Sequence, residues 1–186
     1  MKKITRKLLA AGILAGGIVF LAEGCGQAGK QKSTEPLDSE KQEVWVQKEL
    51  QFQLPEGFTE AAGREGLYVP GETDAVSCIL YAESEAEPQL ELLNEDSYEE
   101  LLEEAYAKLL GMKIQAELTE FYEWKLDGYP AYHMETRILL EDVEYLCTED
   151  LVFKGDKAVS LTFFLNTGEA YSTAFDQCED SLQAQE

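Results

Sequence analysis

The stretch GYPAYHMETRILLEDVEYLCTEDLVFKGDKAVSLTFFLN (residues 128–166) predicts most of the fold. It contains three of four extended runs that are rich in aliphatic and aromatic residues, at 112–125, 130–140, 143–154 and 158–166. Pairs of turn-forming residues separate these runs: Asp127-Gly128, Glu141-Asp142 and Gly155-Asp156. Because such short turns can join only antiparallel neighbours, the sequence predicts an antiparallel meander of four strands.

Alternation within each run assigns the side chains to faces. The predicted apolar faces are Ile114, Ala116, Leu118, Tyr122 and Trp124; then Tyr132, Met134, Ile138 and Leu140; then Val143, Tyr145, Cys147, Leu151 and Phe153; then Val159, Leu161, Phe163 and Leu165. A two-residue loop joins an even-numbered position to an odd-numbered one, and Glu141-Asp142 satisfies this rule. The other two turns join faces of equal parity. We therefore expect odd-length loops or bulges at Asp127-Gly128 and Gly155-Asp156.

The remaining elements complete an α+β domain over residues 43–186. Period-two alternation predicts strands at 50–54 and 75–82, with a short strand between them at 66–70. Ser97 and Glu100 have the spacing of a capping box, and Gly111 supplies a C-terminal stop, so we expect a helix over 98–110. Helical spacing also predicts a second helix over 168–182, from the positions of Tyr171, Phe175, Cys178 and Leu182. Both helices are expected to pack on the antiparallel sheet.

Three short motifs stand out: Leu54-Pro55-Glu56-Gly57-Phe58, Gly128-Tyr129-Pro130-Ala131 at the meander entrance, and a terminal helix with Phe175 and Ser181-Leu182. Through these motifs, residues 44–183 bear a resemblance to the PsbP-like family. This resemblance implies a PsbP-like sandwich of sheet and helices, and a domain that binds or scaffolds without catalysis. It implies no ligand, because no metal-binding or photosystem-contacting residue of the family can be matched to a position here.

The N-terminus predicts export and lipid attachment at Cys25. A basic start at residues 1–7 precedes a charge-free apolar run, Leu8–Ala22, which is shorter than the roughly 20 residues of a membrane-spanning helix. The sequence Leu21-Ala22-Glu23-Gly24-Cys25 resembles the lipobox of bacterial lipoproteins, in which a peptidase cuts before a cysteine carrying a diacylglyceryl group. Leu21 stands one place too far upstream, and Glu23 replaces a small residue. Simple secretion and an uncleaved anchor are the alternatives.

This reading divides the chain into a signal peptide (1–24), a lipidated cysteine with a disordered tether (25–42) and the folded domain. The tether has Leu37 as its one large apolar residue and cannot bury enough surface to fold. Acyl chains such as palmitate on Cys25 would hold the protein at the extracytoplasmic face of the cell membrane. Without residues 1–24 the chain has 11 basic and 36 acidic side chains, a formal charge of −25. Nucleic acid is therefore not an expected partner.

The candidate functional side chains are few. His133 is the only histidine, which excludes two-histidine metal sites, and parity places it on the outer face of the sheet. We expect no metal and no cofactor. Cys78, Cys147 and Cys178 lie on apolar faces, and a disulfide between Cys147 and Cys178 is conceivable if the last helix covers the third meander strand. Parity separates Cys147 from His133, which argues against a Cys-His nucleophile.

An aromatic surface formed by Tyr122, Trp124, Tyr129 and Tyr132 is the candidate binding platform, with core packing as the alternative. No catalytic residue can be assigned, since a chain with this many acids offers countless carboxylate pairs. The sequence thus favours a non-catalytic, membrane-anchored lipoprotein that binds or scaffolds an unknown envelope protein or ligand. A carboxylate-based hydrolase of the envelope and a small-molecule carrier are the alternatives. Two converging carboxylates, one with a raised pKa, would favour the hydrolase.

Overall fold

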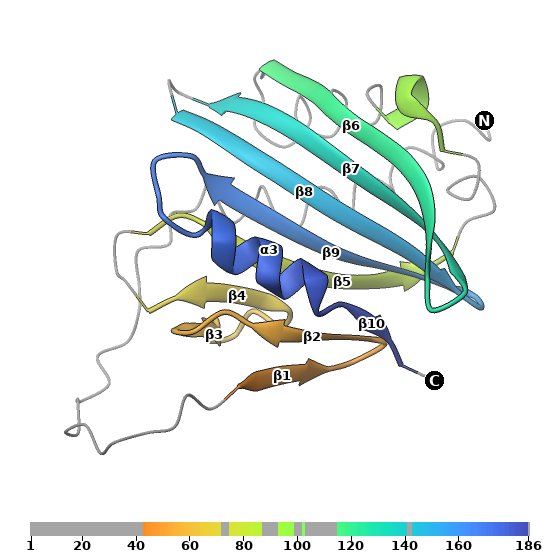
Figure 1. The fold of residues 1–186 in the computed structure, drawn as a ribbon, viewed down its shortest axis with the longest axis horizontal. Coiled ribbons are helices and arrows are strands. Elements are labelled where there is room, and N and C mark those ends of the chain that lie inside the picture. The colour runs from red at the N-terminus through yellow and green to blue at the C-terminus, as the bar shows by residue number, and fades with distance from the viewer. Residues whose placement is uncertain are drawn as a thin grey trace.

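The computed structural model describes residues 43–71, 75–86, 93–98, 102, 115–140 and 143–185 (Figure 1). The predicted signal peptide, Cys25 and tether lie outside these ranges, as does most of the predicted helix over 98–110. Within the described ranges, no helix has both the length and the apolar character that a membrane span requires.

The strands form two antiparallel sheets. The smaller sheet has the order β1-β2-β10, formed by Val44–Gln47, Leu50–Leu54 and Gln183–Ala184. The larger sheet has the order β3-β4-β5-β9-β8-β7-β6. Its strands are Phe58–Glu60, Leu67–Pro70, Cys78–Glu85, Lys157–Asn166, Val143–Lys154, Tyr129–Leu140 and Gln115–Leu126, in that order. The last four include the predicted meander, so the α+β fold class is confirmed.

Both turns with unfavourable parity are two-residue loops. Leu126 lies opposite Tyr129, and Lys154 lies opposite Lys157. Asp127 and Gly128 have φ values of 51° and 92°, the left-handed pair that tight hairpins use. The odd-length loops predicted here are therefore wrong. At Glu141-Asp142 the pairing of Leu140 with Val143 leaves the two-residue connection that the sequence predicted, although residues 141–142 are themselves outside the described ranges.

A bulge does occur in the first hairpin, but it lies inside β6. The pairing register shifts between Leu118 and Glu120, which leaves Thr119 as the extra residue. Since one extra residue reverses the alternation, Tyr122 and Trp124 point to the face opposite Leu118. The sequence assigned all three to one face, which is wrong.

Apolar side chains cover both faces of the larger sheet, and this explains the second parity conflict. One face, which we call the α3 face, carries Ile79, Val152, Val159, Leu161 and Phe163 and packs against the smaller sheet and helix α3 (Ser172–Asp180). The opposite face carries Leu80, Met134, Cys147, Leu151 and Phe153 and packs against Leu93, Tyr98 and Leu102. Strand β9 is buried from Ala158 to Leu165 without interruption, so its alternation cannot reveal an outer face.

Both helices begin at different residues from those predicted. The amide of Ser97 donates to Asn94 Oδ1 (3.0 Å) and the amide of Asn94 donates to Ser97 Oγ (2.9 Å), so Asn94 is the cap and Ser97 its reciprocal partner. Residues 95–98 are helical. Helix α3 starts at Ser172 rather than 168 because the Asn166 side chain and carbonyl accept the amides of Gly168 and Glu169 in a turn. In Figure 1, α3 lies across the larger sheet, as predicted for the last helix.

Candidate functional site

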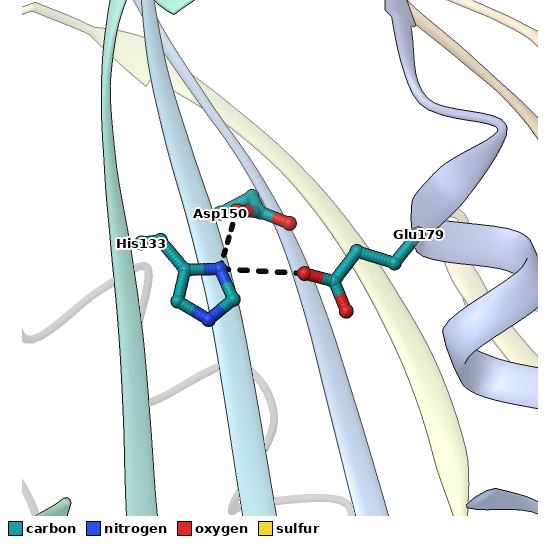
Figure 2. A group of neighbouring side chains, drawn as sticks. All are labelled: His133, Asp150 and Glu179. Atoms are coloured by element: carbon teal, nitrogen blue, oxygen red, sulfur yellow. Dashed lines mark hydrogen bonds and ion pairs between the residues drawn. The ribbon is translucent and has the colours of Figure 1, made fainter. Parts of the chain in front are cut away.

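A buried histidine between two carboxylates is the main polar cluster on the α3 face. His133 on β7 lies opposite Asp150 on β8, and its Nδ1 is 2.9 Å from Asp150 Oδ1. Glu179, near the end of α3, brings Oε1 to 3.3 Å from the same nitrogen. Figure 2 shows both carboxylates directed at that side of the ring.

The burial of His133 corrects the prediction that it is a surface residue. Only 7% of the residue is exposed, and Asp150 is 1% exposed. Parity correctly placed His133 on the face opposite Tyr132 and Met134, but that face is covered by α3. The sequence reasoning assumed that one face of the sheet is exposed to solvent, but around His133 both faces of the larger sheet are covered.

Tyr122 completes the cluster from the other side of His133. It lies opposite His133 in the β6–β7 pairing, and its ring stacks on the imidazole with centroids 4.7 Å apart and planes at 20°. Tyr122 is nevertheless 42% exposed. It is therefore the one member of the predicted aromatic surface that both contacts the buried cluster and is exposed to solvent.

The other predicted aromatic residues do not form one platform with Tyr122. Trp124 and Tyr129 are on the α3 face but half-buried against its core, where the Lys154 ammonium lies over the Tyr129 ring at 5.7 Å. Tyr132 is buried on the opposite face, beside Phe121 and Phe153. The structure thus does not bring the four residues together as one exposed surface, because Tyr132 lies on the other face of the sheet and Trp124 and Tyr129 are half-buried.

The charges of the cluster and its burial shift the pKa values of His133 and Glu179. Burial alone would lower the pKa of His133, but its hydrogen bond to Asp150 and the charges of Asp150, Glu179 and Glu120 outweigh burial and raise this pKa. Burial, assisted by neighbouring carboxylates, raises the pKa of Glu179 to about 7, while His133 opposes this rise. In addition, Asp150 Oδ2 is buried and has no hydrogen-bond partner in the described part of the chain.

A second buried acid, Glu149, is the neighbour of Asp150 in β8. Glu149 is 2% exposed on the opposite face, where the Tyr98 hydroxyl donates to its Oε2 at 2.9 Å. Burial raises the pKa of Glu149 to about 7, although the Tyr98 hydrogen bond lowers it. The sequence reasoning missed both acids. The available signal was Glu149-Asp150 itself, two consecutive acids inside an apolar strand whose side chains must enter both layers.

Cys78, Cys147 and Cys178 are thiols, and the conceivable Cys147–Cys178 disulfide is not formed. Cys147 is buried on the opposite face of the larger sheet, whereas Cys178 is buried on the α3 face. The sheet itself separates them. Burial raises the pKa of both thiols, that of Cys178 to about 12. The predicted separation of Cys147 from His133 is confirmed, since the two lie on opposite faces.

Comparison with solved structures identifies the fold. The solution structure of cyanobacterial PsbP (CyanoP) from Synechocystis sp. PCC 6803 matches 82% of this chain and 98% of its own, with 15% identity and a TM-score of 0.60. LpqN of Mycobacterium tuberculosis, described as involved in cell envelope biogenesis, matches 78% of this chain and 91% of its own at 12% identity and a TM-score of 0.47. No protein-family model and no curated protein matches. The chain has a PsbP-like fold, as the sequence resemblance predicted.

Proposed function

We propose that this chain is a lipid-anchored, extracytoplasmic domain that binds a basic segment of an envelope protein and catalyses no reaction. The anchor rests on the basic start, the short apolar run and Cys25. The observation that carries the binding role is the exposed Tyr122 on strand β6, set against the buried His133.

Strand β6 has the properties of a docking edge. It is the terminal strand of the larger sheet, twelve residues long, and β7 is its only neighbour among the described strands. An edge of this length presents unpaired amide and carbonyl groups that an extended segment of another protein can pair with. Glu117, Glu120 and Glu123 are exposed along it, which favours a partner with lysine or arginine residues.

A hydrolase is the second candidate, because Asp150 and Glu179 converge and the pKa of Glu179 is raised to about 7. Burial favours the binding role over this alternative. Asp150 is 1% exposed and His133 is 7% exposed beneath the Tyr122 ring, so neither side chain is open to a substrate. A general acid or base must come within hydrogen-bond reach of the substrate. Of the three, only Glu179 is accessible at its side chain.

Replacing Cys25 with serine is expected to move the protein from the membrane fraction to the soluble extracytoplasmic fraction. Serine cannot form the thioether that holds the acyl chains, and two or more chains are needed for durable anchoring. Fractionation followed by intact mass measurement checks this. The matched control, Cys178→Ser, leaves Cys25 intact and should stay with the membrane. Finding the Cys25→Ser variant still membrane-bound, or the native chain unacylated, would remove the anchor from the proposal.

A photo-crosslinking amino acid tests the binding edge. Placed at position 122 in the anchored protein, it is expected to give a discrete adduct with an envelope protein. Trp45 on β1 is the matched control position, since it is an aromatic residue with similar exposure, 39% against 42% for Tyr122, on the other sheet. Adding Glu117→Gln, Glu120→Gln and Glu123→Gln together should weaken the adduct at position 122. Equal adducts at both positions, or none at position 122, would contradict docking along β6.

A further inference from the structure

We propose that His133, Asp150 and Glu179 together bind a divalent transition-metal cation such as Zn²⁺. This inference goes beyond the proposed partner binding and does not depend on it. Each of the three residues offers one ligand atom, a ring nitrogen or a carboxylate oxygen, and these three atoms lie within 4.8 Å of one another.

The spacing matches a small coordination sphere. Zinc bonds to imidazole nitrogen and carboxylate oxygen are about 2.0–2.2 Å long, so neighbouring donors in a tetrahedron are roughly 3.3 Å apart. The observed separations from His133 Nδ1 are 2.9 Å to Asp150 and 3.3 Å to Glu179. The Asp150 and Glu179 ligand atoms are also within 4.8 Å of each other, so a modest side-chain adjustment would admit the ion. One nitrogen and two carboxylates suit zinc or manganese better than calcium, which prefers a sphere of oxygen alone.

Hydrogen bonding alone leaves the cluster incompletely satisfied. His133 Nδ1 carries at most one proton, yet two carboxylate oxygens face it, and a third, the buried Asp150 Oδ2, has no partner in the described chain. Leaving a buried charged oxygen unpaired is costly. A dication replaces the single proton, can engage all three oxygens, and neutralises both carboxylates at once.

The surroundings would hold the ligands in place. Asp150 and His133 sit on adjacent paired strands, and the Tyr122 ring fixes the plane of the imidazole. Glu179 comes from α3, and its side chain is 32% exposed, so an ion would enter from this side. A bound ion would connect the end of α3 to β7 and β8.

The test uses the full chain purified in detergent and treated with EDTA, with ZnCl₂ as the probe. His133 is the only histidine, so its imidazole signals in NMR report this site without assignment. Zn²⁺ is expected to shift them with 1:1 stoichiometry. Glu179→Gln should lower the affinity at least about tenfold, since even loss of a residue that only orients a ligand costs that much. The matched control Asp176→Asn, an exposed acid on the same helix, should not.

Two results would overturn the proposal. Zinc uptake that leaves the His133 signals unmoved would show that the ion binds only to the acidic surface. Equal affinity in the native chain and Glu179→Gln would exclude the helix as a ligand source. Neither result bears on the crosslinking at position 122, so the two proposals fail separately.

Discussion

Replacing Gly66 with alanine is expected to lower the free energy of unfolding by about 2–5 kcal/mol, the sum of a left-handed backbone cost and a steric overlap. Gly66 has φ +77°, and a Cβ there would lie 2.3 Å from the carbonyl oxygen of Tyr81. The backbone cannot easily move away, because the Gly66 amide donates to Glu60 Oε1 and its carbonyl accepts the Tyr81 amide, both at 2.8 Å. Urea unfolding followed by circular dichroism measures the loss.

Gly63→Ala is the matched control for this effect. Gly63 has nearly the same φ, +76°, but a Cβ there meets nothing within 4 Å. It should therefore show only the left-handed cost of roughly 1–2 kcal/mol. Equal losses in the two variants would mean that the Gly66 turn does not press against β5.

The meander could be predicted because its turns and strands carry strong local signals. Asp127-Gly128 and Glu141-Asp142 mark tight hairpins, and the runs between them have few alternatives. What failed was the inference from parity to loop length. It assumed that each strand has one apolar face, whereas β9 is apolar on both, as strands covered by two layers are. The residues around Gly155-Asp156 do not show whether the following strand has one apolar face or two.

The sequence analysis missed the histidine cluster for a related reason. His133 was assigned to the correct face. Whether that face is buried depends on α3, which is distant in sequence and begins only at Ser172. Tyr122 was displaced by the bulge at Thr119, whose only local signature is a Thr119-Glu120 pair between the apolar residues Leu118 and Phe121. Pairing β7 with β8 through a two-residue loop would, however, have placed Asp150 opposite His133 from sequence alone.

Phe52→Ala is expected to lower the free energy of unfolding by about 3–5 kcal/mol, as for other buried phenylalanines. Phe52 is fully buried between the sheets, edge-on to Tyr68 at 5.8 Å and stacked on Tyr81 at 6.3 Å. Its two ring contacts connect β2 to β4 and β5. Typical domains are stable by about 5–15 kcal/mol, so this loss would remove a large share of the total stability. The urea midpoint measures it.

The same substitution tests whether the two sheets and the histidine cluster unfold together. The amide of Gln53 donates to Ser181 Oγ at 2.8 Å, which connects β2 to the end of α3, two residues beyond Glu179. In a Trp124→Phe background, which leaves Trp45 on the smaller sheet as the one tryptophan, loss of Phe52 should therefore lower the midpoints of tryptophan fluorescence and of the His133 NMR signal by the same amount. Trp45→Ala, at an exposed position on β1, should cost only about 1 kcal/mol. A folded His133 signal persisting after the fluorescence transition would show instead that the smaller sheet unfolds separately and does not support the site.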